Sequence, residues 1–290
     1  MTRPFTLLSG AILAIILVTA AACLAPPTDA CGAACQPPPP PPQASCGATI
    51  PLIAPDSEWP NAPLGFTVAS DEPFNTLGGD GWQVAQRRTI NGSGVSLARD
   101  TTAPASPDNV LRFTYGVGFP AGYEPGLAFF DLPTPTKGAY FGFWWKPSNP
   151  WQNNEVSGVN KIAFLLTAQT AIHGGMVIMM FSTGGPYTLQ VQPEFPNDTR
   201  RLEPNVVTTP IVLGAWHRIE WFVQFSSDSA SRNGVTAWWL DGVLQGRYTD
   251  LQMPADGFRE YQLAPTWGGV VGTKSETDFF CYDHAFLSHS

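Results

Sequence analysis

Charged side chains are scarce in this 290-residue chain, at 13% of all residues, whereas glycine, proline and tryptophan are abundant. Long surface helices need many Glu, Lys and Leu residues, so this composition disfavours a helical protein. No stretch carries a helical apolar period over three turns, and no internal repeat of fixed length is present. The composition instead favours many short strands separated by turns.

The chain also lacks an excess of basic residues, since its formal net charge at pH 7 is −8. Phosphate binding needs a basic surface, so nucleic acid is not expected as a partner. The same charge disfavours an acidic polysaccharide, unless a basic groove overrides it locally. There are only four histidines and the cysteines are dispersed, which disfavours a zinc site.

The N-terminal region predicts export. A short basic start precedes an apolar stretch, residues 7–18, that is too short to span a membrane comfortably, and small residues precede Cys23. Ala20-x-Ala22 fits cleavage by ordinary signal peptidase, whereas a cysteine after three small residues resembles a bacterial lipoprotein box. We favour the second interpretation, in which residues 1–22 are removed and Cys23 carries the lipid. The protein is then either anchored at a membrane surface of the bacterial cell envelope or secreted.

Residues 23–46 contain almost no large apolar side chain, so they cannot form a core. Six consecutive prolines at 37–42 favour polyproline II over roughly 19 Å, and we interpret the segment as a disordered stalk. Residues 47–290 then form one domain. With Cys23 lipidated, the remaining cysteines can pair as Cys31 with Cys35 in the stalk and Cys46 with Cys281. The second disulfide clips the start of the domain to its last strand.

Nine segments of the domain read as strands bounded by Gly, Pro or Asn. They are residues 110–115, 139–146, 161–167, 176–182, 187–192, 216–225, 236–240, 243–248 and 278–288. The alternation is clearest in 216–225, where Ile219, Trp221 and Val223 share one face and Arg218 and Glu220 the other. An Asp-Gly pair between two of the segments predicts a hairpin. The pattern predicts an all-β, two-sheet antiparallel β-sandwich of the jelly-roll type.

Six segments, which together span most of residues 139–284, carry a resemblance to a known superfamily. They are Phe141-Gly-Phe-Trp-Trp-Lys-Pro-Ser-Asn-Pro-Trp151, Val159-Asn-Lys-Ile162, Trp216-His-Arg-Ile-Glu-Trp221, Trp238-Trp-Leu-Asp-Gly-Val-Leu244, Pro265-Thr-Trp-Gly-Gly269 and Tyr282-Asp-His284. They resemble concanavalin A-like lectin/glucanase sandwiches, and within these the bacterial proteins of the heparin lyase I type. The resemblance implies the sandwich fold, but that fold hosts lectins, hydrolases, lyases and inert domains. The carboxylate motif of the glucanases and the motifs of alginate lyases are absent.

Eliminative cleavage of a uronate needs a base, an acid and a group that neutralises the carboxylate. Tyr282 and His284 lie two residues apart on a predicted strand, hence on one face, as a candidate catalytic pair. Polar side chains on other strands can line the same concave sheet. They are Asn160, Lys161, Gln190, Gln192, Arg218 and Glu220. The alternative is that this polar face is only solvated and that the pair closes the sandwich edge.

Tryptophan is the other conspicuous residue. Adjacent tryptophans at 144–145 and 238–239 must point to opposite faces of their strands, so half of them leave the buried interface. Trp151 and Trp267 lie in Pro- or Gly-rich loops, where stacking on a sugar and structural packing are equally open.

The sequence therefore predicts an exported, lipid-anchored monomer whose sandwich binds a polysaccharide and whose lipid contacts the membrane. The alternatives are a polysaccharide lyase that acts on a uronate-containing glycan and a non-catalytic structural protein of the envelope. No cofactor is expected. A sandwich of this kind can hold a structural calcium ion, but no motif locates one.

Overall fold

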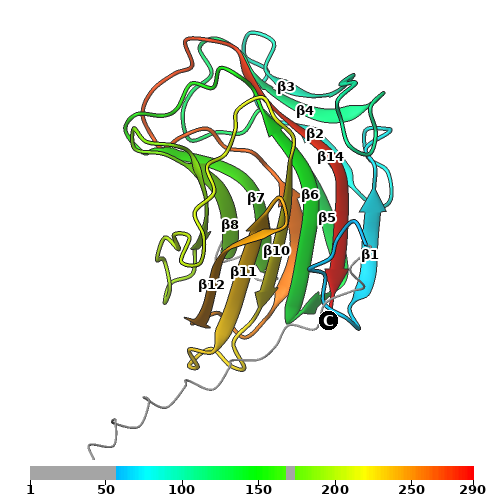
Figure 1. The fold of residues 1–290 in the computed structure, drawn as a ribbon, viewed down its shortest axis with the longest axis vertical. Helices are drawn as coiled ribbons and strands as arrows, with labels where there is room; N and C mark the ends of the chain where they lie inside the picture. The colour runs from blue at the N-terminus through cyan, green and yellow to red at the C-terminus, as the bar shows by residue number, and fades with distance from the viewer. Residues whose placement is uncertain (1–56, 168–173) are drawn as a thin grey trace, which may run out of the picture. The chain divides into compact units, whose positions relative to one another are not determined.

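The computed structural model describes residues 57–167 and 174–290. In these ranges the chain forms fourteen strands in two antiparallel sheets, which confirms the predicted all-β sandwich (Figure 1). These ranges contain no helix, and thus none that is long and apolar enough to cross a membrane. The proposed signal peptide, the Pro-rich stalk, and Cys23, Cys31, Cys35 and Cys46 lie outside the described residues.

The larger sheet has eight strands. They are β1 (Thr67–Glu72), β3 (Gly94–Ala98), β4 (Val110–Tyr115), β6 (Gly138–Pro147), β10 (His217–Gln224), β11 (Gly234–Leu240), β12 (Val243–Leu251) and β14 (Asp278–His289). Their order is β12-β11-β10-β6-β14-β4-β3, and β1 pairs with β14 beside this path.

The smaller sheet has six strands. They are β2 (Gln83–Gln86), β5 (Gly126–Thr136), β7 (Val159–Thr167), β8 (Gly175–Phe181), β9 (Thr188–Pro193) and β13 (Phe258–Leu263). Their order is β2-β5-β13-β7-β8-β9, and β7 and β8 bend markedly along their length (Figure 1). Each of the nine predicted segments overlaps a strand of one sheet or the other, with bounds that differ by up to three residues, whereas β1, β2, β3, β5 and β13 were not predicted.

The core lies between the two sheets and follows the predicted alternation. Phe141 and Phe143 on β6 stand directly opposite Trp221 and Ile219 on β10, and all four side chains are fully buried in one cluster. Tyr261 of β13, in the smaller sheet, reaches the same cluster and meets Phe141 edge to face. Each large side chain buried in this way contributes about 1.5–3 kcal/mol.

The far side of the eight-stranded sheet is covered by the first described residues, which we call segment 57–66. Trp59 and Ala62 of this segment pack on Tyr140, Phe222 and Phe286 in a second apolar cluster. Gly142 makes the approach possible, because a Cβ atom there would lie 2.4 Å from Cε3 of Trp59. The sheet therefore has two buried faces, one on the core and one under segment 57–66.

Candidate functional site

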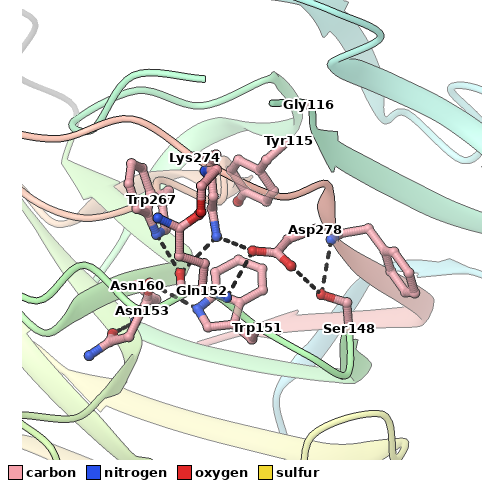
Figure 2. Close-up of polar contacts among 12 residues, drawn as sticks. Tyr115, Gly116, Ser148, Trp151, Gln152, Asn153, Asn160, Trp267, Lys274 and Asp278 are labelled. Carbon is pink, nitrogen blue, oxygen red and sulfur yellow. Dashed lines mark hydrogen bonds and ion pairs between the residues drawn. The ribbon is translucent and has the colours of Figure 1, made fainter. Parts of the chain in front are cut away.

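Three of the predicted sugar-binding residues come together, but inside the protein (Figure 2). Trp151 is 5% exposed, Trp267 1% and Asn160 not at all. The indole of Trp151 donates to Oδ1 of Asn160 at 3.2 Å, and that of Trp267 donates to the backbone oxygen of Gln152 at 2.8 Å. Rings buried in this way cannot stack on a sugar, so the binding role predicted for these three residues is wrong.

Lys274 lies at the centre of this cluster. Its ammonium contacts a carboxylate oxygen of Asp278 and donates to the backbone oxygen of Gln152 at 2.8 Å (Figure 2). It also lies 3.8 Å from the ring centroid of Trp151 and 4.7 Å from that of Trp267. Burial lowers the pKa of Lys274 to about 8, although Asp278 acts in the opposite direction. Lys274 thus acts as an internal cation that ties its own loop to the loop of Gln152 and to the start of β14, a role that the sequence analysis missed.

The predicted catalytic pair is separated by a β-bulge. The pairing of β14 with β6 shifts register between Asp283 and Ala285, and His284 adopts a φ of 48°. Tyr282, before the bulge, points into the core, where it is fully buried and its hydroxyl donates to the backbone oxygen of Ile162 at 2.8 Å. The two side chains do not share a face, and Tyr282 cannot reach a polysaccharide, so its prediction as a catalytic residue is wrong.

His284 lies on the opposite side of the eight-stranded sheet, between two carboxylates. Its Nδ1 is 3.0 Å from Glu58, and its Nε2 contacts Asp71. Burial disfavours the charged imidazole, but the bonds to Glu58 and Asp71 outweigh it and raise the pKa of His284 to about 9. A histidine that stays protonated at neutral pH is a poor general base. The predicted catalytic role of His284 is therefore not supported by its surroundings.

Arg218 and Glu220 lie beneath segment 57–66 and not in a groove with Lys161. Glu220 is fully buried, and one of its oxygens accepts from the hydroxyl of Tyr140 at 2.7 Å and from the backbone N–H of Asn61 at 3.0 Å. Arg218 donates to the backbone oxygen of Glu58 at 3.0 Å. Both residues hold this segment in place, so the prediction that they line the sugar-binding sheet is wrong.

Lys161, Gln190 and Gln192 lie on the six-stranded sheet, on the side turned away from the core, which we call the open face. Lys161 stands opposite Met179, and Met179 stands opposite Gln190 on the next strand. The neighbouring row is formed by cross-strand partners as well: Phe164 stands opposite Val177, and Val177 stands opposite Gln192. These three predicted residues therefore share one side of the sheet, but Gln190 is only 5% exposed and Met179 is fully buried, so this side is covered over β8 and the sugar-binding role predicted for Gln190 is wrong.

A groove of about 510 Å³ lies on the open face. It is lined by Arg87, Leu127, Phe129, Phe164, Leu166, Thr167, Gly174, Gly175, Glu194, Glu260 and Gln262. Phe129, Gln262 and Phe164 occupy adjacent positions on β5, β13 and β7, so an amide lies between two half-buried aromatic rings. Sequence analysis missed Phe129 and Gln262 because it did not predict their strands.

Three charged residues of the described ranges line the groove, Arg87, Glu194 and Glu260, and the two carboxylates each have a charged neighbour. Lys161 donates to Glu194 at 2.7 Å, so the cation predicted to bind sugar has its own partner. Glu260 stands opposite Asp131, and burial, together with the charge of Asp131, raises the pKa of Glu260. Among the described residues the lining includes no histidine or tyrosine, and no group of three or more His, Cys, Asp or Glu is placed to hold a metal ion.

Cys281 is a buried free thiol, with Nε of Arg112 at 3.5 Å from its sulfur. Burial raises the pKa of this thiol, which keeps it in the unreactive protonated form. The predicted disulfide with Cys46 is therefore not formed in this structure, and Cys46 itself lies outside the described residues.

Comparison with known proteins finds no matching family model and no matching curated protein. Among solved structures, the alginate lyase vAL-1 from Chlorella virus superposes with a TM-score of 0.55 at 11% identity, covering 77% of this chain and 100% of that one. The alginate lyase Aly36B superposes with a TM-score of 0.52 at 12% identity, covering 75% and 95%. A variant of Aly36B in complex with an alginate trisaccharide gives 0.52 at 12% identity, covering 68% and 88%. At these identities the likeness concerns the fold alone, and the narrower resemblance to heparin lyase I stays a prediction. The chain thus shares the jelly-roll β-sandwich of polysaccharide lyases.

Proposed function

We propose that the protein binds a polysaccharide along the groove on the open face of the six-stranded sheet. The observation that carries the proposal is the row Phe129, Gln262 and Phe164 on three adjacent strands. A sugar ring presents an apolar face that packs on an aromatic ring, and hydroxyls that bond to amides and carboxylates. The row offers both kinds of contact side by side.

The row continues on either side, to Gln83 on β2 and, through Val177 on β8, to Gln192 on β9. Val177 is fully buried, so only the part of the row over β2, β5, β13 and β7 is open to a ligand. Four strands at a spacing of about 4.8 Å give a length of about 14 Å, which accommodates a short run of sugar units in line. An elongated, shallow surface of this kind suits a segment of a linear polymer better than a single small sugar.

Binding is favoured over eliminative cleavage by the side chains that line the groove. Its described lining has neither the tyrosine nor the histidine that would serve as a base, and Tyr282 is buried in the core. Purified protein should be retarded in gels loaded with the right polysaccharide without releasing unsaturated product that absorbs in the ultraviolet. The proposal is wrong if no member of a broad polysaccharide array binds above background.

Phe164→Ala should weaken binding of the recognised polysaccharide by at least about tenfold, because a half-buried ring at the centre of the row is lost. Isothermal titration measures the change. Phe66→Ala is the matched control, since Phe66 is also half-buried but lies against the far side of the eight-stranded sheet. Equal losses for the two variants would argue against the groove as the binding site.

We also propose that the sandwich is exported and anchored through a lipid on Cys23. The support is the sequence alone, in which an apolar leader and three small residues precede this cysteine. Cys23→Ser should move the protein from the detergent phase to the aqueous phase of a Triton X-114 partition and abolish labelling with a radioactive fatty acid. Cys31→Ser is the control and should remain labelled. Unchanged partition of Cys23→Ser would contradict the anchor.

A further inference from the structure

The groove continues at one end into a smaller cavity of about 120 Å³. The cavity is lined by Thr167, Gly174, Phe195, Pro196, Asn197, Ser229, Gln252, Pro254 and Asp256. Thr167 and Gly174 line the groove as well, so the two spaces adjoin where β7 ends and β8 begins. A polymer lying in the groove can therefore place a substituent in this cavity.

Asp256 gives the cavity its chemical character. Both of its carboxylate oxygens are buried, and neither has a hydrogen-bond partner. Asp256 forms no ion pair in the described part of the chain either, and the ammonium of Lys137 donates instead to the backbone oxygen of the preceding residue, Ala255, at 2.6 Å. Because no partner offsets the charge of this buried carboxylate, it attracts a positively charged group that enters the cavity.

A second unneutralised negative site lies on the adjoining strands. Glu260 and Asp131 face each other across β13 and β5, and Glu260 accepts only a neutral amide hydrogen bond, from Gln262 at 2.7 Å. Neighbouring Arg259 favours the charged form of Glu260, but burial and Asp131 oppose it more strongly. The Asp131–Glu260 pair thus has no direct cationic partner in the described ranges.

The cations of the groove do not balance these carboxylates. Lys161 is paired with Glu194. Arg87 follows β2 directly and lies near Leu127, at the end of the groove away from the Asp256 cavity. A polyuronate would therefore meet unpaired negative charge at the Asp256 end and would be repelled there. A polymer with positive substituents would be attracted.

We propose that this end of the groove selects polysaccharides that carry amino sugars, with one ammonium group drawn into the cavity by the buried charge of Asp256 and another placed against the Asp131–Glu260 pair. This inference rests on the proposed function and names its substrate class. An ammonium group fits better than a metal ion, because Phe195, Pro196 and Pro254 supply apolar walls while Asp256 is the only carboxylate among the described residues that line the cavity. The methylene and ring carbons that carry an amine pack on such walls.

The test compares three hexasaccharides by isothermal titration at a pH where amines are protonated. They are the glucosamine hexamer, its fully N-acetylated counterpart and a hexamer of guluronate. The glucosamine hexamer should bind at least tenfold more tightly than the neutral hexamer, and the guluronate hexamer should bind most weakly. If the neutral hexamer binds as tightly as the glucosamine hexamer, the selectivity is wrong while polysaccharide binding in the groove stands. If no polysaccharide of the array binds, the proposed function itself fails.

Asp256→Asn should clearly reduce the preference for the glucosamine hexamer, because one of the two ammonium positions loses its counter-charge, without unfolding the protein. Because the variant removes an unpaired buried charge, its melting temperature should be equal to or higher than that of the parent. Asp108→Asn is the control: Asp108 is 83% exposed and pairs with Arg99, so its loss should leave the preference intact. Calcium should be titrated alone into the parent protein and into Asp256→Asn, and the two should give the same heat. A binding heat that is present in the parent and lost in the variant would overturn the ammonium assignment in favour of a metal site.

Discussion

Lys274→Met is expected to lower the free energy of unfolding by about 3–5 kcal/mol, the range for breaking a buried ion pair from one side. The substitution leaves Asp278 buried, with only the hydrogen bonds from Ser148 and the backbone N–H of Gln152 to satisfy its charge. It also removes the donor to the backbone oxygen of Gln152. Urea denaturation followed by tryptophan fluorescence measures the loss.

A double-mutant cycle separates the ion pair from the packing around it. Asp278→Asn alone should be destabilising, because it leaves the ammonium of Lys274 without a counter-charge among three aromatic rings. Lys274→Met combined with Asp278→Asn should lower the free energy of unfolding by less than the sum of the two single changes, since the double variant leaves no buried charge without its partner. Simple additivity would mean that the pair contributes only through side-chain volume.

The exposed pair Arg99–Asp108 is the control for this experiment. Its side chains are 73% and 83% exposed, so Arg99→Met should change the free energy of unfolding by less than about 0.5 kcal/mol. If Lys274→Met costs no more than Arg99→Met, then the cluster of Figure 2 does not hold the loops together as we infer.

The strands with alternating apolar residues could be predicted from sequence, because one face of each is buried. β4 has the predicted bounds, and the alternation of β10 appears as Ile219, Trp221 and Val223 in the core. The hairpin at Asp241-Gly242 also forms, with positive φ at both residues, as a tight two-residue turn requires. Each of these signals is local, so it survives without knowledge of the neighbouring strands.

The two central strands of the groove were missed for a physical reason. β5 contains Pro133 and Pro135, which argue against a strand, but only its first four residues pair with β2. Its later part is therefore free on one side, where a missing backbone N–H is tolerated. β13 is short and alternates charged or amide side chains with Tyr261 and Leu263, and a six-residue pattern of this kind is weak evidence. Because β5 and β13 were not predicted, Phe129, Glu260 and Gln262 were not included in the predicted site.

The errors in the predicted site come from long-range structure. Counting two residues along β14 placed Tyr282 and His284 on one face, but the bulge between Asp283 and Ala285 reverses the side of His284. Trp144 and Trp239 do leave the core, as their positions next to Trp145 and Trp238 predict, yet both lie in the cluster under segment 57–66. Which face is covered depends on a distant segment, and a strand's own sequence does not carry that information.

Raising the pH from 6 to 10 is expected to loosen segment 57–66 from the eight-stranded sheet. The pKa of His284 is about 9 in the folded protein, against 6.5 for an unperturbed histidine. A histidine whose pKa is higher in the folded than in the unfolded protein stabilises the fold fully at pH values below its unfolded pKa. That stabilisation is lost as the pH rises through its folded pKa. The contact of His284 with Glu58 should therefore be strong at pH 6 and largely lost at pH 10.

The size of this effect is limited by solvent. The difference between the two pKa values corresponds to about 3 kcal/mol. The side chains of Glu58 and Asp71 are 38% and 59% exposed, however, so screening reduces the effect to on the order of 1–2 kcal/mol. Lys274 acts in the opposite direction over an overlapping range, because its lowered pKa of about 8 favours the folded state as the pH rises. Global stability would mix the two effects, and a local measurement is needed.

Hydrogen exchange at the amides of Asn61 and Ala62 supplies that measurement, because they donate to Glu220 and to the backbone oxygen of Trp59 within the covered face. After correction for intrinsic exchange, their protection should fall between pH 8 and pH 10 in the parent protein. In His284→Asn it should already be low and nearly independent of pH. Asparagine is chosen because it tolerates the positive φ at this position. Protection that falls equally in both proteins would contradict a role for His284. Polysaccharide affinity of the two proteins should be the same, since segment 57–66 and the groove lie on different sheets.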